Sequence, residues 1–268
     1  MMTGKLPEYK IFAIRYATRA ARRAEHFIGG DPHDAPMPMD YFVWALVGPE
    51  RTFLIDTGFT AEVASRRKRE FLRCPIESLK MIGVEPEAIS DVIITHLHYD
   101  HVGNFHKLPN ARFHLQEREL AFATGRHIRY PYFAHGFEVE DVVGMVRLNF
   151  KRRVELYDGD VELAPGLTLH LAAGHTAGLQ VVRVNTQRGK VVLASDSSHY
   201  YENFQSDRPF TAVLNIGDVM DSFRKIERLA ASPQHIVPGH DPLVMQRYPA
   251  PSASLKGVVV SLDVDPAQ

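Results

Sequence analysis

A cluster of metal-binding side chains follows one short apolar run in this sequence. Within six positions the chain places His96, His98, Asp100 and His101, immediately after the apolar residues 92–94. An apolar run that ends in a polar cluster is typical of a buried strand whose end opens into a site. His96 and His98 are two residues apart, so on an extended backbone they point to the same side. Asp100 and His101 would then lie on the following loop and face a second centre.

These residue types indicate a metal site with hydrolytic chemistry. Imidazole suits zinc, iron, nickel or copper, and a carboxylate among the ligands is more typical of a catalytic than of a structural site. The chain has 14 His, so some clustering arises by chance, and a single His-x-His pair would carry little weight. The complete His-x-His-x-Asp-His pattern after an apolar strand is much more specific.

Three further residues of the same types occupy equivalent places later in the chain. His175 lies in a Gly-His-Thr sequence, Asp196 follows the apolar residues 190–194, and His240 lies in a Pro-Gly-His sequence. Each comes just after a predicted strand. Strand ends that meet at one edge of a sheet would bring them close to His96.

Length and composition predict one soluble domain. The chain has 268 residues, 45% of them hydrophobic, and a net charge of −1, which excludes a strongly basic nucleic-acid or membrane-surface protein. Cys74 is the only cysteine, which excludes a disulfide framework and a thiolate metal cage. We see no signal peptide at the start and no membrane span. We therefore expect a single domain over 1–268, a cytoplasmic location, and no nucleic-acid or membrane partner.

Hydrophobic periodicity predicts strands and helices in two successive halves. Two such halves suggest two packed sheets flanked by helices, with the site at the strand ends. We expect residues 17–40 to form a long loop, which lies either near the site mouth or, equally, as an ordinary excursion on the surface. The strands are predicted over 10–16, 41–46, 52–55, 92–94, 111–115, 161–163, 167–171, 180–185, 190–194 and 235–238, and the helices over 61–73, 77–82, 116–123 and 219–231.

An insertion over about 124–150 separates the first motif from His175. It is rich in aromatic residues and histidine, including Tyr130, Tyr132 and Phe133. We interpret it as a lid or a substrate-pocket wall; the alternative is that these rings only pack the insertion onto the body. Four apolar residues near the N-terminal loop have two similar interpretations, because they would either line an acyl pocket or belong to the core. We slightly favour the core for Met37, Met39, Tyr41 and Phe42.

Taken together, the motifs resemble the metallo-β-lactamase superfamily over about residues 8–245. The strand-turn Leu-Ile-Asp-Thr-Gly at 54–58 also matches. The resemblance implies an α+β fold, an αββα four-layer sandwich of two mixed sheets flanked by helices. It also implies two divalent metal ions, with zinc expected first and iron, manganese or cobalt as alternatives. By this resemblance His96, His98 and His175 would bind one ion, Asp100, His101 and His240 the other, and Asp196 would bridge them.

Within that superfamily the chain is most similar to the N-acyl homoserine lactonases, the quorum-quenching branch. Chain length, the interval from Asp196 to His240 and the segment 196–210 support this. Penicillin-hydrolysing members usually carry Arg at the place of His101 and Cys at that of Asp196. Glyoxalase II enzymes add a C-terminal helical domain, for which too few residues follow His240. The chain departs from better-known lactonases at His199, where they place a Tyr. Either His199 or Tyr200 would therefore contact the substrate carbonyl. The alternative for His199 is a supporting role only.

The expected activity is metal-dependent hydrolysis of a lactone ring, with N-acyl homoserine lactones as the small-molecule substrates. Asp100 would carry a proton to the leaving alkoxide and His199 would stabilise the oxyanion, while Asp56 and Thr176 would orient ligand histidines. The alternatives are hydrolysis of another lactone, an ester or a thioester, an iron-binding redox protein, and a structural metal protein. The acyl chain length and the native metal stay open, as does a homodimer.

Overall fold

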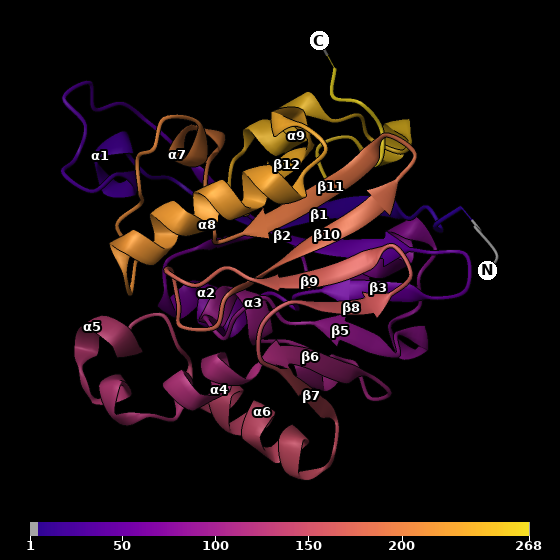
Figure 1. The fold of residues 1–268 in the computed structure, drawn as a ribbon, viewed down its shortest axis with the longest axis horizontal. Helices are drawn as coiled ribbons and strands as arrows, with labels where there is room; N and C mark the ends of the chain where they lie inside the picture. The colour runs from indigo at the N-terminus through magenta and orange to yellow at the C-terminus, as the bar shows by residue number, and fades with distance from the viewer. Residues whose placement is uncertain (1–4, 268) are drawn as a thin grey trace.

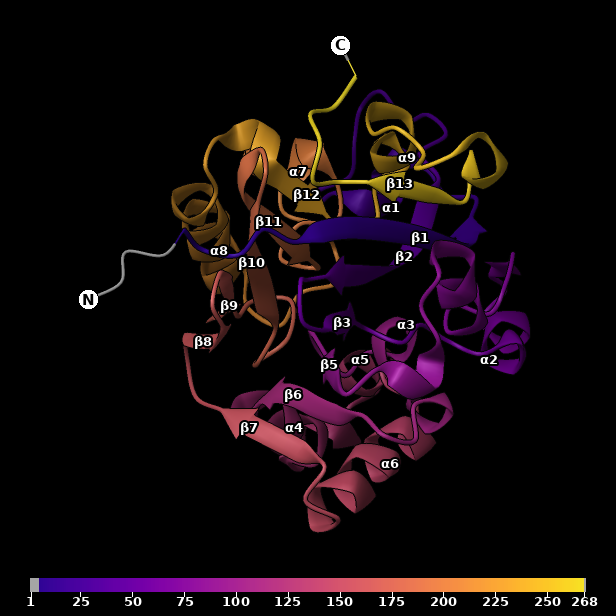
Figure 2. The same cartoon turned by 90° about the vertical axis from the view of Figure 1, so that its right-hand side faces the viewer.

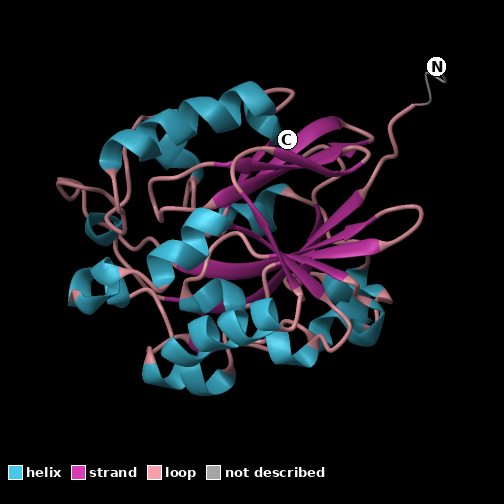
Figure 3. Ribbon diagram, turned by 60° about the horizontal axis from the view of Figure 1, so that its bottom comes forward, coloured by secondary structure: helices cyan, strands magenta, loops and turns pink. Residues whose placement is uncertain are grey.

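Two β-sheets pack face to face between two layers of helices. The computed structural model describes residues 5–267. Figure 1 shows α8 across the small sheet and α4 and α6 below the large one, and Figure 3 shows the strands enclosed between helices on two sides. Seen from the side, the two sheets form separate layers (Figure 2). The predicted αββα sandwich is therefore confirmed.

The large sheet is mixed. Its order is β13-β1-β2-β3-β5-β6-β7, and β4 pairs with β1. The strands from β13 to β3 run antiparallel, whereas β3, β5, β6 and β7 are parallel. The bounds are β1 (Lys10–Arg19), β2 (Met39–Val47), β3 (Thr52–Ile55), β4 (Glu70–Phe71), β5 (Asp91–Ile93), β6 (Arg112–Gln116), β7 (Val154–Tyr157) and β13 (Val259–Ser261).

The small sheet has the order β12-β11-β10-β9-β8 and is also mixed. Its strands β8 to β11 are antiparallel neighbours, and β12 joins β11 in parallel. The C-terminal ends of β11 and β12 therefore lie side by side, which brings Asp196 close to His240. The bounds are β8 (Val161–Ala164), β9 (Leu167–Leu171), β10 (Gln180–Thr186), β11 (Gly189–Ser195) and β12 (Ile236–Pro238).

Most helices are short, and the longest packs on the small sheet. That helix, α8 (Ile216–Leu229), begins where the Asn215 side chain accepts hydrogen bonds from the Gly217 and Asp218 amides. The others are α1 (Arg23–His26), α2 (Ala61–Arg66), α3 (Tyr99–Val102), α4 (Glu117–Ala123), α5 (Pro131–Ala134), α6 (Val139–Phe150), α7 (Tyr201–Gln205) and α9 (Leu243–Arg247), with 3₁₀ turns at Glu77–Ile82, Pro86–Ala88, Phe105–Lys107, Arg126–Arg129, Pro233–His235 and Ala253–Leu255.

Strand β2 shows why the large sheet is buried on both faces. Its side chains alternate, so Phe42 and Trp44 join the core between the sheets, whereas Tyr41, Val43 and Ala45 join the core beneath the outer helices. A strand buried on both faces reads as a nearly continuous apolar run. The fold thus has two hydrophobic cores separated by one sheet.

The secondary-structure prediction was wrong in several places. The helix expected over 61–73 ends at Arg66, and the chain then forms β4 against β1. Strands β7 and β13 were not predicted, because each is a short edge strand whose few residues alternate weakly. The loop expected over 17–40 is shorter than predicted, because β1 continues to Arg19 and β2 begins at Met39. Residues 20–38 between them are largely irregular, apart from α1.

None of the helices over residues 5–267 has the length and apolarity that crossing a membrane requires.

A buried carboxyl group in the insertion should make stability depend on pH. Burial, helped by the nearby Glu138, raises the pKa of Asp141 to about 7. An unfolded aspartate titrates near pH ~4, so from about pH 4 to pH 7 the folded protein keeps a proton that the unfolded chain has lost. Stability therefore falls across that window. We predict that Asp141→Asn raises the free energy of unfolding at pH 8 by about 1–3 kcal/mol.

Urea denaturation at pH 4.5 and pH 8 tests this prediction. The free energies of unfolding of the two proteins should converge at the lower pH, where the carboxyl group is neutral in the folded state. Glu140→Gln is the matched control, because Glu140 is the adjacent acid on the same turn and is exposed. If Asp141→Asn raised the free energy of unfolding equally at both pH values, packing and not ionisation would be responsible.

Candidate metal centre

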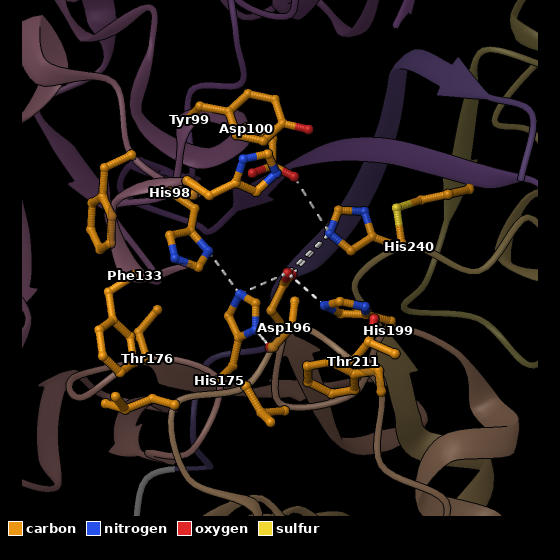
Figure 4. Close-up of a pocket in the computed structure, with 18 of the residues that line it drawn as sticks. His98, Tyr99, Asp100, Phe133, His175, Thr176, Asp196, His199, Thr211 and His240 are labelled. Carbon is orange, nitrogen blue, oxygen red and sulfur yellow. Dashed lines mark hydrogen bonds and ion pairs between the residues drawn. The ribbon is translucent and has the colours of Figure 1, made fainter. Parts of the chain in front are cut away.

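The predicted ligand residues converge from both sheets. His96 and His98 follow β5, and Asp100 and His101 lie on α3. His175 lies in the loop between β9 and β10, Asp196 directly follows β11, and His240 follows β12. The other six side chains converge with Asp196, and Figure 4 shows His98, Asp100, His175 and His240 around it. The sequence therefore predicted which residues come together.

Two groups of three residues can each hold an ion. His96, His98 and His175 have ligand atoms within 4.8 Å of one another, as do Asp100, His101 and His240. In the first group Nδ1 of His98 lies 2.9 Å from Nε2 of His175. In the second group Oδ2 of Asp100 lies 3.7 Å from Nε2 of His101 and 3.8 Å from Nε2 of His240.

Asp196 lies between the two groups. Its Oδ1 is 3.0 Å from Nε2 of His240 and 3.4 Å from Nε2 of His101. Its Oδ2 is 3.4 Å from Nε2 of His175 and 4.0 Å from Nε2 of His96. Oδ2 also lies 3.2 Å from Nε2 of His240, so Oδ1 faces the second group and Oδ2 lies between the two groups. The carboxylate is therefore within reach of both groups, as a bridging ligand requires.

The donor atoms fit metal ions. Among the described residues Nε2 of His96, Nε2 of His101 and Oδ1 of Asp196 are buried without a hydrogen-bond partner. Buried polar atoms are rarely left unpaired in a stable fold, and one cation in each group, with Asp196 shared, would satisfy all three. The mixed nitrogen and oxygen donors suit zinc and other first-row divalent metals.

The electrostatics of the site also favour cations. Burial lowers the pKa of His96 and His98 well below the usual value and that of His175 to about 4, so these rings are neutral, as metal binding requires. Burial alone would raise the pKa of Asp196, but the histidines around it lower it well below its ordinary value.

Asp56 holds the ligand loop in place from behind. Its Oδ2 lies 2.7 Å from Nδ1 of His101 and accepts the Thr95 hydroxyl, and its Oδ1 accepts the Thr95 amide. This arrangement orients His101 toward the centre, so the orienting role predicted for Asp56 is confirmed. Thr176 does not play that role, because its hydroxyl makes no hydrogen bond to a ligand histidine within residues 5–267.

Sequence reasoning missed Glu119. Its buried carboxylate accepts the Leu97 amide at 2.9 Å and the Gly178 amide at 2.9 Å, so it joins the His96–His98 loop to the His175 loop. Glu119 lies on α4 among other charged residues, and no spacing distinguishes it from its exposed neighbours Glu117 and Arg118. Only the fold reveals that it faces inward.

The structure separates the two residues that compete for the substrate carbonyl. His199 lines the cavity, stacks on Phe210 with ring centroids 3.8 Å apart, and places Nε2 2.9 Å from Oδ2 of Asp196. Tyr200 points away from the metal centre, and its hydroxyl lies 2.9 Å from Nε2 of His26 and 3.2 Å from the Pro38 carbonyl.

The candidate metal centre forms the floor of a cavity of 630 Å³. The insertion supplies one wall, which includes Tyr132, Phe133 and Phe137. The N-terminal segment supplies another, so the expectation that residues 17–40 lie near the site mouth is confirmed. Met39 and Tyr41 line this cavity, Phe42 is in the core, and Met37 lines a separate pocket.

A family comparison agrees with this geometry. The sequence model of the metallo-beta-lactamase superfamily matches residues 38–240, which contain every candidate ligand. This chain belongs to the metallo-beta-lactamase superfamily. The fold that carries the cavity and its central aspartate is therefore that of this superfamily, and the loops around the cavity give it its shape.

Several relatives within the superfamily carry one functional name. The chain is 30% identical to an N-acyl homoserine lactonase of Bacillus sp over 168 residues, 62% of this chain and 61% of that protein. It is 26% identical to the N-acyl homoserine lactonase AttM of Azorhizobium caulinodans over 238 residues, 80% of this chain and 85% of that protein. The chain thus spans about 61% of the length of the first of these relatives.

Solved structures of the superfamily share the fold. A quorum-quenching N-acyl homoserine lactone lactonase superposes with a TM-score of 0.74 at 22% identity, covering 89% of this chain and 94% of that one. The hydrolase AbOPH of the beta lactamase superfamily superposes with a TM-score of 0.70 at 17% identity, covering 99% of this chain and 100% of that one.

A close backbone approach at Gly136 should control the position of His98. A Cβ atom at Gly136 would lie 2.4 Å from Nε2 of His98, and the Gly136 carbonyl accepts the Tyr99 amide at 2.8 Å. We predict that Gly136→Ala displaces His98 and lowers metal affinity about 10- to 100-fold, the usual effect of disturbing the support of a ligand. Titration against a chelating dye, with metal analysis, measures this.

Gly217→Ala is the matched control for this substitution. Gly217 lies on α8, where a Cβ would meet only Oδ1 of Asn215 at 3.3 Å. Full metal binding by Gly136→Ala would show that His98 is not constrained by the insertion.

Proposed function

We propose that this chain is a dinuclear metal-dependent hydrolase that opens lactone rings, with N-acyl homoserine lactones as its substrates. One observation carries the proposal: seven histidine and aspartate side chains meet around Asp196 at the floor of a cavity large enough for a small molecule. The names of the relatives support the substrate class. The alternative within the same chemistry is another lactone, an ester or a thioester.

The proposed ligand assignment follows the two groups. His96, His98 and His175 would hold one ion, Asp100, His101 and His240 the other, and Asp196 both, with zinc the expected metal and iron, manganese or cobalt as alternatives. When bound, such ions polarise a carbonyl and lower the pKa of water. Asp56 and Glu119 keep the ligand loops in place.

The protein's own groups complete the reaction. Hydrolysis adds water across the ring C–O bond, so the carbonyl carbon gains a hydroxyl group and the ring oxygen gains a proton. Asp100 lines the cavity and is our candidate to deliver that proton. Burial lowers the pKa of His199, which favours its neutral ring, and its Nε2 lies 2.9 Å from Oδ2 of Asp196. The ring lines the cavity, and it is our candidate to contact the substrate carbonyl oxygen.

The wider organisation of the chain stays a prediction. We retain one domain over 1–268, with the 124–150 insertion acting as a lid or pocket wall. A cytoplasmic location and a homodimer likewise stay predictions.

Proton release from a lactone panel tests the activity. The purified, zinc-loaded protein would be incubated with γ-butyrolactone and with homoserine lactones of short and long acyl chains. We expect ring opening whose kcat/KM rises with acyl length, because longer chains bury more apolar area against the aromatic wall. Asp196→Asn should lose activity and metal together.

Three outcomes would contradict this proposal. Turnover of esters or thioesters but of no lactone, with two metals per chain, would favour the alternative substrates. Stoichiometric iron with a visible absorption band would indicate a redox protein. A fully active and fully metallated Asp196→Asn would exclude the bridging role.

His199 and Tyr200 can be separated by neighbouring substitutions. We predict that His199→Phe lowers kcat about 10²–10³-fold, the typical cost of losing one oxyanion donor, while metal content stays unchanged. Tyr200→Phe is the matched control and should keep kcat, because its hydroxyl faces His26. A loss of metal in His199→Phe would identify His199 as a ligand instead.

A further inference from the structure

Two arginines line the cavity beside a strand pair. The register of β1 with β4 pairs Ala17 with Phe71 and Thr18 with Glu70, and Arg19 and Arg69 are the next residues along the two paired segments. Both arginines line the cavity that contains the candidate metal centre. Two guanidinium groups in one cavity favour the binding of an anion.

The protein supplies little negative charge to this pair. Arg69 donates from Nε to the Tyr99 hydroxyl at 3.1 Å and from Nη1 to the Arg67 carbonyl at 2.8 Å, and both acceptors are neutral. No carboxylate lies within 4.0 Å of its guanidinium over residues 5–267. The carboxylate of Asp100 is in the neighbourhood, but it belongs to the candidate metal group.

The positive charge of Arg19 is only slightly better compensated by carboxylates. Its Nη1 is 3.5 Å from Oε2 of Glu25, and its Nε is buried without a partner. The other oxygen of Glu25 accepts the Arg22 amide at 2.8 Å. By contrast Arg23, nearby in sequence, has two carboxylates, of Asp31 and Glu202, at 2.9 and 2.7 Å. One distant carboxylate for two guanidinium groups leaves this wall positive.

The arginines lie beside the candidate metal centre. The Tyr41 ring contacts His240 with centroids 5.2 Å apart, the Tyr41 hydroxyl is 3.5 Å from that of Tyr99, and Tyr99 accepts from Arg69. These contacts connect Arg69 to His240 through Tyr99 and Tyr41. Arg69 also borders the insertion, because it donates to the Arg67 carbonyl and Arg67 donates to the Phe137 carbonyl at 3.2 Å. We call Arg19 and Arg69 the arginine wall.

Another part of the cavity is aromatic. The Phe137 ring lies 4.8 Å from that of His98, and Tyr132 and Phe133 continue this wall. In Figure 4 Phe133 lies beside His98 and Thr176, whereas His240 lies across Asp196 from them. The cavity around the reacting centre therefore has both a positive wall and an apolar wall.

We propose that this cavity takes lactones or esters that carry a carboxylate away from the reacting carbonyl, with the arginine wall binding that carboxylate and the aromatic wall binding an apolar part. The guanidinium fork matches carboxylate geometry and forms strong charge-assisted hydrogen bonds. The inference rests on the proposed hydrolase function and narrows its substrate class. A neutral acyl homoserine lactone would use the aromatic wall and leave the arginine wall in water.

A matched substrate pair tests the inference. One homoserine lactone would carry an acyl chain ending in a carboxylate, and the other the same chain ending in a carboxamide. We expect the wild-type protein to favour the acid. Arg69→Gln and Arg19→Gln should each raise KM for the acid about tenfold, the usual effect of losing one charge-assisted hydrogen bond, with kcat and the carboxamide KM unchanged.

The control variant is Arg228→Gln, which removes an exposed arginine of α8 outside the cavity. Metal content and thermal stability of each variant show whether it is folded and loaded. Equal KM values for acid and carboxamide in the wild type would overturn the proposal, as would variants that raise both KM values alike.

A binding measurement separates this inference from the activity. Sulfate would be titrated into the zinc-loaded proteins by calorimetry, and any sulfate bound at the metal centre should remain in the variants. Weaker sulfate binding in Arg69→Gln and Arg19→Gln, but not in Arg228→Gln, supports the arginine wall even if no lactone is opened. Identical sulfate binding in all four proteins would overturn it.

Discussion

A buried carboxylate surrounded by imidazole rings is the interaction on which this structure depends. Asp196 is almost fully buried, and its two oxygens lie among histidines of both groups. An isolated charge in such a place would be very costly. Burial keeps His96, His98 and His175 neutral, as metal binding requires, whereas the carboxylates around His101 and His240 raise the pKa of these two rings against the effect of burial. Cations shared by both groups would compensate the charge of Asp196. The fold therefore has to deliver side chains from both sheets to one point.

The contacts between the sheets serve that purpose. Gln180 on β10 donates its side-chain amide to the carbonyls of Ile94 and His114, and the Ser195 hydroxyl donates to Thr95. With Glu119, these buried hydrogen bonds connect the loops that carry the ligands. The backbone is also constrained there: Asp56 and Ser195 have φ angles of 60° and 43°, which non-glycine residues rarely adopt. Strain at the two strand ends is consistent with a site that fixes its ligand loops firmly.

The ligand set and the layer order could be predicted from the sequence because both follow from local patterns. His96 and His98 lie two residues apart just past the end of β5, and Asp196 and His240 follow the ends of β11 and β12. Glu119 and Gln180 could not be predicted, because their roles depend on partners far along the chain. The helix predicted over 61–73 was wrong beyond Arg66 for a related reason. Residues past Arg66 have helix-compatible sequence, but pairing with β1 decides their conformation, and tertiary context overrides propensity.

The regions that were hardest to predict are those that shape the cavity. The irregular segment that follows β1 and the 124–150 insertion supply walls, whereas the residues that follow the strand ends supply its floor. A fold of this kind can keep one reacting centre and change its substrate through the loops alone. The arginine wall illustrates the point, since it arises where β1 continues to Arg19 and meets a strand of two residues. The metal ligands therefore specify the type of reaction, and the charge and apolarity of the walls specify which molecule can present its carbonyl to them.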